Sequence, residues 1–176
     1  MFKYLKVKSK KRGFTLIEIL VVIVIIGVLA SVIFVAVDKA RMKSRDSTRL
    51  LHISQIQMAL EIYRFRNGQY PNSDMKGCGG WDTSGPGGSE TTGTFLTALV
   101  DGGYIPQHFQ DPTTNTSCGN YRYYRYTSGY GCTDTFYVLG IVDMETSGNP
   151  YPKSPGWSCP TRNWQSEMEW VIGGFE

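Results

Sequence analysis

A run of 24 residues from Phe14 to Val37 contains only one charged side chain, that of Glu18. The hydrocarbon core of a bilayer is about 30 Å thick, and a helix of roughly 20 apolar residues crosses it. The segment is therefore long enough to span a membrane. An ionised carboxylate within an apolar helix costs on the order of 2.5–3.5 kcal/mol on insertion scales, so we expect Glu18 to have a partner.

The residues before this segment suggest what the partner is. A basic leader that ends in Lys10-Lys11-Arg12-Gly13 precedes Phe14. Cleavage of the peptide bond between Gly13 and Phe14 would create a new α-amino group on Phe14, and Glu18 of a neighbouring copy could neutralise it. The single acid would then act as an assembly signal.

The motif Gly13-Phe14-Thr15-Leu16-Ile17-Glu18, between a basic leader and an apolar run, resembles the class III signal of type IV pilins and type II secretion pseudopilins. The resemblance implies that a membrane-embedded prepilin peptidase cuts after Gly13 and methylates the amine of Phe14. It also implies that Glu18 and Thr15 act in assembly, with Glu18 setting subunit registry. The implied partners are other copies of the chain and an inner-membrane assembly platform.

Two other interpretations of the apolar segment explain less. An ordinary single-pass anchor accounts for the length, but for neither Glu18 nor the junction after Gly13. A secretory signal peptide needs a small-x-small cleavage site after its apolar region, and cutting after Ser31 or Ala36 would place Leu29 or Phe34 in that motif. We therefore expect residues 14–37 to stay in the mature protein.

Charge predicts the orientation of the chain. Six of its 18 Lys and Arg side chains lie in the leader, which leaves 12 basic against 15 acidic side chains after cleavage. A basic segment before a membrane helix tends to stay in the cytoplasm, so the part after Val37 should lie outside. A second basic cluster, from Lys39 to Arg49, weakens this argument without reversing it. We expect a single-pass precursor in the inner membrane and a periplasmic or extracellular fibre.

Periodicity predicts an α+β fold in which a long N-terminal helix packs on a small antiparallel sheet. No proline interrupts the chain from Phe14 to about Arg66, so one continuous helix is expected. In its second half an apolar stripe recurs at three- and four-residue steps, and Arg49 is expected largely off this stripe. The stripe consists of Leu50, Ile53, Ile56, Leu60 and Tyr63.

After Asn67-Gly68, which ends the helix, the sequence predicts a smaller set of elements. A long Gly-rich loop covers residues 72–93, and a short helix covers residues 94–100 with Phe95, Leu96 and Leu99 on its buried side. Strands are expected at 121–126 and 135–142, joined as a hairpin, with a third at 169–172. The expected domains are a cleaved leader (1–13), a membrane-spanning and fibre-core helix (14–37), the extramembrane half of the helix (38–66) and a globular head (67–176).

The head is also loosely similar to that of the major pseudopilin and its pilin relatives. Major pseudopilins bind calcium in a loop near their last strands, and Asp143, Glu145 and Asn149 are candidate ligands by residue type alone. A solvated turn is the alternative role for these three residues. We expect no other cofactor.

Four cysteines, Cys78, Cys118, Cys132 and Cys159, lie in the exported part. An even number of cysteines outside the cytoplasm favours two disulfides. Of the three possible pairings we favour Cys118 with Cys132 and Cys78 with Cys159, because we expect the first pair to bracket a hairpin or loop. A zinc site of four thiolates is the alternative, although the chain has no Cys-x-x-Cys spacing.

No motif for catalysis is present, and the chain has only two histidines, His52 and His108. We therefore expect a protein that is not an enzyme. The strand at 121–126 alternates tyrosines with Arg122 and Arg125, a pattern that can bind nucleic acid by stacking and charge. A role of these tyrosines in covering the helix is the favoured interpretation, so we do not expect nucleic-acid binding.

The sequence as a whole predicts a structural subunit of a type IV pilus-like or type II secretion pseudopilus fibre. These two kinds of fibre use the same assembly physics, and the sequence does not separate them. From a different class, the alternative is a membrane-anchored extracellular binding module that does not polymerise. Such a module would keep its leader and would not need Glu18.

Overall fold

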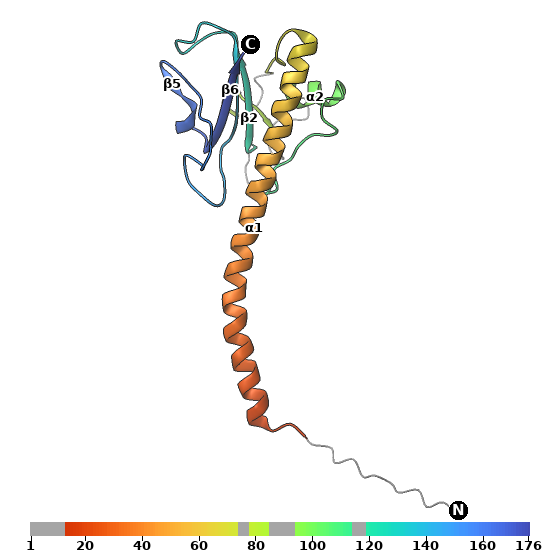
Figure 1. Ribbon diagram of the computed structural model, residues 1–176, viewed down its shortest axis with the longest axis vertical. Helices are drawn as coiled ribbons and strands as arrows, with labels where there is room; N and C mark the ends of the chain where they lie inside the picture. Colours follow the sequence, from red (N-terminus) through yellow and green to blue (C-terminus); the bar gives the residue numbers. More distant parts are fainter. Residues whose placement is uncertain (1–12, 74–77, 85–93, 114–118) are drawn as a thin grey trace, which may run out of the picture. The chain divides into compact units, whose positions relative to one another are not determined.

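The computed structural model of the protein describes residues 13–73, 78–84, 94–113 and 119–176. Residues 1–12 of the predicted leader lie outside this part. The chain divides into two compact units, Met1–Ala40 and Arg41–Glu176. Helix α1 (Leu16–Asn67) runs through both units, which confirms the predicted continuous helix (Figure 1).

In the first unit the apolar side chains of α1 are exposed over the whole predicted span. Ile19 is 50% exposed and Val35 is 58% exposed. By length and composition, α1 is the one helix of the described residues that could cross a membrane. The helix of the first unit is therefore apolar all round from residue 19 to residue 37, as a lipid-facing or bundled segment requires.

The second unit contains a four-stranded antiparallel sheet in the order β1-β2-β3-β6. Strand β3 (Phe136–Ile141) pairs along its whole length with β2 (Tyr121–Tyr126) on one side and with β6 (Trp170–Phe175) on the other. The short β1 (Asp82–Ser84) pairs with β2 at the edge. A separate hairpin joins β4 (Ser158–Cys159) to β5 (Arg162–Asn163). The remaining elements are α2 (Thr94–Asp101), η1 (Cys78–Gly80) and η2 (Trp164–Ser166).

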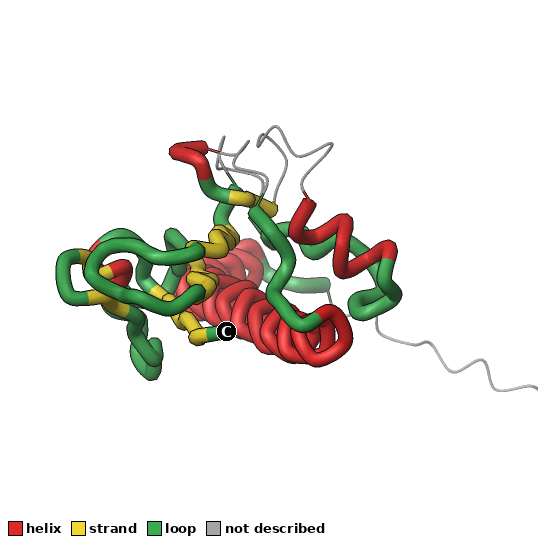
Figure 2. The backbone as a smooth tube through the Cα atoms, turned by 90° about the horizontal axis from the view of Figure 1, so that it is seen from above, coloured by secondary structure: helices red, strands yellow, loops and turns green. Residues whose placement is uncertain are grey.

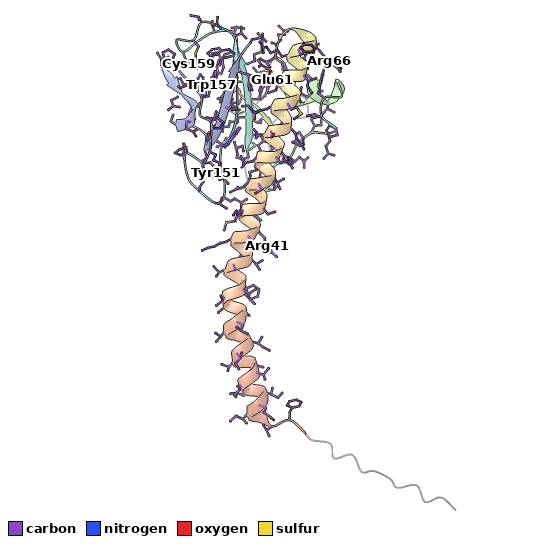
Figure 3. The ribbon with its side chains drawn as sticks, viewed as in Figure 1. Arg41, Glu61, Arg66, Tyr151, Trp157 and Cys159 are labelled. Atoms are coloured by element: carbon purple, nitrogen blue, oxygen red, sulfur yellow. A yellow bond between two sulfur atoms is a disulfide. The ribbon has the colours of Figure 1, made fainter. Side chains whose placement is uncertain are left out.

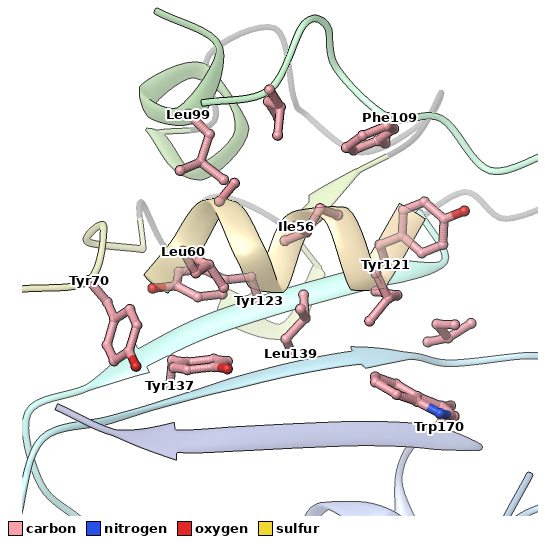
Figure 4. Packing of buried hydrophobic residues seen from close by; sticks show 14 of the residues in the cluster. Ile56, Leu60, Tyr70, Leu99, Phe109, Tyr121, Tyr123, Tyr137, Leu139 and Trp170 are labelled. Carbon is pink, nitrogen blue, oxygen red and sulfur yellow. The ribbon is translucent and has the colours of Figure 1, made fainter. Parts of the chain in front are cut away.

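Within this unit the sheet lies on one side of α1 and α2 lies on another (Figures 1 and 2). Ile56 and Leu60 of α1 are completely buried over Tyr123 and Leu139 of the sheet (Figure 4). Leu99 of α2 packs on the helix from the other side and is also completely buried. The apolar stripe of α1 is thus covered from two directions, as its spacing predicts.

The opposite face of the sheet carries a second core, which explains why every residue of β3 is buried. Phe136 and Val138 of β3 point into this core, while Tyr137 and Leu139 belong to the core under α1. Trp164 of η2 fills its centre and is completely buried. The chain segment from 151 to 169 covers this face, where Figure 3 places Trp157 and Cys159. The head therefore has two cores separated by one sheet.

The structure confirms the predicted α+β fold and corrects several details. The strand expected at 169–172 extends to Phe175, and β1 lies inside the segment that we expected to be a loop. The hairpin of β4 and β5 was not predicted. Arg49, expected off the stripe, is only 1% exposed. The side chains of Phe95 and Leu96 lie outside the described residues.

Candidate assembly site

The start of α1 is closed by a reciprocal pair of hydrogen bonds between Thr15 and Glu18. The backbone N–H of Thr15 donates to Glu18 Oε2 at 2.8 Å, and the backbone N–H of Glu18 donates to Thr15 Oγ1 at 3.3 Å. The Thr15 hydroxyl also donates to Glu18 Oε2 at 2.8 Å. This arrangement is a capping box, in which two backbone donors that the helix leaves free are satisfied by side chains.

The capping box fixes where the only acid of the apolar segment lies. Because Thr15 holds Glu18 back toward the first turn, the carboxylate stays at the amino end of α1, next to the residue that follows Gly13. A negative charge at this end is also favoured by the helix dipole, typically by 0.3–1 kcal/mol in exposed sites. The predicted residues Gly13, Phe14, Thr15 and Glu18 therefore lie together at one end of the helix, all exposed.

A second polar constellation, which we call the Arg49 cluster, anchors α1 within the head. It consists of Arg45, Asp46, Arg49, Asp111 and Glu145. The guanidinium of Arg49 donates through Nε and Nη2 to the two oxygens of Asp111 at 2.7 and 2.9 Å. Its Nη1 donates to Asp46 at 2.7 Å and to Glu145 at 2.9 Å.

The fifth donor of Arg49 is also used, since Nη2 reaches Thr113 Oγ1 at 2.9 Å. All five N–H groups of a guanidinium are thus satisfied, which is the condition for burying this side chain. Arg45 forms a fork with Glu145, with its Nε 2.7 Å from Oε1. The cluster carries two positive and three negative charges, so every cation in it is neutralised.

The acids of the cluster tie two loops to the helix. Asp46 accepts from the backbone N–H groups of Glu145 and Thr146 at 3.0 and 2.9 Å and from the Thr146 hydroxyl at 2.6 Å. Asp111 accepts from Asn120 Nδ2 at 2.8 Å. The loop after β3 and the segment before β2 are therefore both held to one turn of α1.

These contacts shift the pKa values of the acids. Burial by itself raises the pKa of Asp111, but hydrogen bonds from Arg49, Asn120 and Thr113 outweigh it and lower the pKa from 3.8 to about 2. The pKa of Asp46 is also lowered, because hydrogen bonds led by that of Thr146 outweigh burial. Arg45 is the main cause of the lowered pKa of Glu145.

We expect the head to lose stability in acid as a result. A carboxyl whose pKa is lower in the folded state stabilises the fold above its unfolded pKa, and this contribution is lost as the pH falls through the folded value. For Asp111 the loss is about 2 kcal/mol between roughly pH 5 and pH 2. Burial raises the pKa of Glu169, which acts in the opposite direction. Urea unfolding of the full chain in detergent at pH 6 and pH 2.5 measures the net effect of these groups. An equal free energy of unfolding at both pH values would contradict the expected loss of stability in acid.

The three candidate calcium ligands are not arranged as a metal site. The Glu145 carboxylate is engaged by Arg45 and Arg49. Asp143 is exposed and bonds Asn120 through its backbone, while Asn149 Oδ1 accepts from Gln165 at 3.4 Å. Among the described residues there is no group of three or more His, Cys, Asp or Glu side chains that could hold a metal ion.

Two of the four tyrosines of β2, Tyr121 and Tyr123, belong to the core under α1, as the favoured interpretation requires, whereas Tyr124 and Tyr126 are half-buried against the core on the opposite face of the sheet. Tyr121 and Tyr123 are 2% and 0% exposed beneath α1, so their rings cannot stack on bases. Arg125 is bound to the Glu176 carboxylate, with Nη2 2.6 Å from Oε2, and to Asn72 Oδ1 at 2.8 Å. The charge of Arg125 is thus neutralised within the head.

The cysteine pairing that we favoured is wrong. The structure joins Cys132 to Cys159, which excludes both Cys118–Cys132 and Cys78–Cys159. The reason is that the loop between β2 and β3 lies on the β4–β5 hairpin: the Thr161 N–H donates to the Tyr130 carbonyl oxygen at 2.9 Å. Cys118 and the side chain of Cys78 lie outside the described residues, so a second disulfide stays a prediction.

Two parts of this site were not found from the sequence. The capping box has a recognisable signal, Thr-x-x-Glu at positions 15 and 18, which precedes the apolar run. The Arg49 cluster has a weaker one: Arg49, Ile53, Ile56 and Leu60 continue the spacing of the buried stripe. Nothing in the sequence, however, indicates that Asp111 and Glu145 are its partners, because they come from distant loops.

Known proteins are similar to this chain both at the start of α1 and over a longer part of the sequence. The prokaryotic N-terminal methylation motif matches residues 8–34. Type II secretion system core protein G of Aeromonas hydrophila is 32% identical over 108 residues, which cover 61% of this chain and 71% of that protein. This chain belongs to the type II secretion core protein G family. No solved structure matches the chain significantly.

Other members of the core protein G family match a shorter part. The protein of Escherichia coli K12 is 39% identical over 71 residues, or 40% of this chain and 49% of that protein. The protein of Pseudomonas aeruginosa is 35% identical over 68 residues, or 39% of this chain and 48% of that protein. The members of this family are structural pseudopilins. This chain is therefore a structural subunit with a prepilin signal and not an enzyme.

Proposed function

We propose that this chain is the subunit of a type II secretion pseudopilus that is processed between Gly13 and Phe14 and assembles through α1. The single observation that carries the proposal is the position of the Glu18 carboxylate, held by Thr15 at the amino end of an otherwise uncharged segment. This position supports pairing with an amine on Phe14. The family membership supports a secretion pseudopilus over a surface pilus.

The proposed mechanism has four steps. Residues 14–37 hold the precursor in the inner membrane, with the head in the periplasm. The prepilin peptidase removes residues 1–13 and methylates the new amine of Phe14, which keeps its positive charge. Glu18 of an adjacent subunit pairs with this amine. The apolar helices then bundle as the fibre core, with the heads outside.

Close packing of the helices and the pair between Glu18 and the Phe14 amine determine which register the subunits adopt in the fibre. Moving an apolar helix from lipid into a bundle gains little hydrophobic free energy, because lipid is itself apolar. Exposed side chains along the first unit of α1 can interdigitate with those of other helices. An unpaired Glu18, by contrast, disfavours any register in which no amine lies nearby.

The intact mass of the protein from its own cells tests the processing steps. We expect a chain that begins at Phe14 and is one methyl group heavier than its sequence. An uncut chain in cells with an active prepilin peptidase would instead favour the anchored binding module, which keeps its leader.

The same measurement after reduction tests the second disulfide. With Cys132 bonded to Cys159, a second bond would have to join the two cysteines that remain, Cys78 and Cys118. We expect a gain of four hydrogens on reduction. A gain of two would leave Cys78 and Cys118 as thiols and contradict the prediction.

A further inference from the structure

The loop that follows β3 has a polarity opposite to that of a calcium site. In a calcium loop carboxylate and carbonyl oxygens turn inward, because the ion takes roughly six to eight oxygen ligands. Here three consecutive backbone N–H groups turn toward carboxylates. The N–H of Met144 donates to Glu169 Oε2 at 2.7 Å, and those of Glu145 and Thr146 donate to Asp46 at 3.0 and 2.9 Å. Such runs of N–H groups bind anions, which here are carboxylates of the same chain.

The carboxylate of Glu145 in this loop is already shared between two cations. Its Oε1 accepts from Arg45 Nε at 2.7 Å and from Arg49 Nη1 at 2.9 Å. Its Oε2 accepts from Arg45 as well, through Nε at 3.0 Å and through Nη2. Both oxygens are thus occupied, and a calcium ion beside them would be repelled by two guanidinium charges.

The two ends of the loop are closed by hydrogen bonds within the chain. At the first end the Asp143 N–H donates to Asn120 Oδ1 at 2.9 Å, and the Asp143 carbonyl oxygen accepts from Asn120 Nδ2 at 2.8 Å. At the other end the Tyr151 N–H donates to the carbonyl oxygen of Glu169 at 2.7 Å. Neither end therefore needs a metal ion to fix it to the sheet.

Few oxygen atoms around the loop remain for a cation. The Asp143 carboxylate is exposed, and one oxygen of Glu169 is taken by the N–H of Met144. The Ser147 hydroxyl is buried without a hydrogen-bond partner among the described residues, but calcium sites are built on carboxylate and carbonyl oxygens. The described part of the chain has no group of three or more His, Cys, Asp or Glu side chains that could hold a metal ion. The donor set does not fit calcium.

We propose that the guanidinium groups of Arg45 and Arg49 hold the loop after β3 to α1 in place of calcium, so that this head folds without a divalent cation. A loop that closes without a metal needs fixed cations for its acids and fixed acceptors for its N–H groups. One turn of α1 supplies both, through the two arginines and Asp46. The inference concerns the head of a single subunit and does not depend on assembly into a fibre.

Urea unfolding in the presence and absence of calcium tests the inference. The full chain in detergent is unfolded in about 10 mM calcium chloride, and in magnesium chloride at the same concentration with EGTA, which matches the ionic strength. A calcium site of the weakest extracellular class, with a Kd of about 1 mM, would raise the ratio of folded to unfolded chain about tenfold in the first solution. We expect ratios that agree within about twofold. A larger rise in calcium would overturn the proposal.

Hydrogen exchange shows which groups hold the loop. In EGTA, Arg45→Met should speed exchange at the amides of Glu145 and Thr146 about threefold or more, because the fork that holds the loop to α1 is lost. Arg64→Met removes a guanidinium from an exposed pair on the same helix and should leave these amides unchanged. Unchanged exchange within β3 shows that the head of each variant stays folded.

Calcium added to the Arg45→Met chain gives the decisive comparison. We expect it to leave the faster exchange as it is, because the N–H groups of the loop still point toward carboxylates. Protection restored by calcium would mean that the ion can hold the loop, and would overturn the proposal. Equal exchange in Arg45→Met and the unsubstituted chain would contradict the role of the guanidinium.

Discussion

Glu18→Ala is expected to leave a processed, methylated and stable chain that forms few or no fibres. The substitution removes the only charge of the apolar segment, so insertion into the membrane becomes easier, not harder. The proposed pairing with the amine of Phe14 is lost at the same time, and a pair worth as little as 1.4 kcal/mol already changes an equilibrium about tenfold. Fibre yield from cells, compared with the amount of mature subunit in the membrane, measures the effect.

Glu18→Gln separates the capping role that the structure shows for this residue from its proposed pairing with the Phe14 amine. The amide oxygen of glutamine can still accept from the Thr15 N–H and hydroxyl, so the capping box is kept while the charge is removed. If pairing with the amine matters, Glu18→Gln should fail in assembly as Glu18→Ala does. Normal fibres from Glu18→Gln would mean that capping, not charge, is the contribution of Glu18.

The substitution Arg49→Met should destabilise the head strongly, with a loss of about 3–5 kcal/mol in the free energy of unfolding. Two carboxylates, those of Asp46 and Asp111, would remain buried without their cation. Methionine fills much of the volume, so the loss reports the charge and not a cavity. Urea unfolding of the full chain in detergent, followed by tryptophan fluorescence, gives the value.

Arg64→Met is the matched control on the same helix. Arg64 pairs with Glu61 at 3.8 Å in a site where both side chains are more than a third exposed, and such pairs contribute little. The loss from Arg49→Met should shrink as the pH falls toward 4, because the orphaned carboxyls then bind protons. A loss that does not depend on pH, or one as small as that of Arg64→Met, would contradict the role of the cluster.

The sequence predicts those parts of the fold that depend on periodicity. Helix α1 and strands β2 and β3 were predicted to within two residues of their places: α1 from the absence of proline and its apolar stripe, β2 from its aromatic residues and β3 from its continuous apolar run. Strands β1, β4 and β5 are three residues or shorter and lie among glycines, prolines and serines, where no repeat can be seen. Their pairing is decided by long-range contacts, which a local pattern does not contain.

In the candidate site, too, a feature with a local sequence pattern was predicted and one that depends on long-range contacts was not. The acid at position 18 is evident in the sequence, because it interrupts an apolar run. Arg49 is misjudged for the opposite reason: it follows basic residues that are exposed, and a rule based on residue type places it with them. Its burial depends on acids from two loops, one 62 and the other 96 positions away, and these partners become visible only when the chain is folded.

The pairing of β3 with β6 has a consequence for the order in which the head can form. Phe136 lies opposite Phe175, and the two acids that neutralise Arg49 from the loops come after α1 along the chain. Early in synthesis the buried stripe of α1 therefore has no sheet to cover it, and Arg49 has only Asp46 beside it. Such non-local closure slows folding. A subunit whose helix is already held in the membrane would have to wait for its last strand before it could present a finished head to its neighbours.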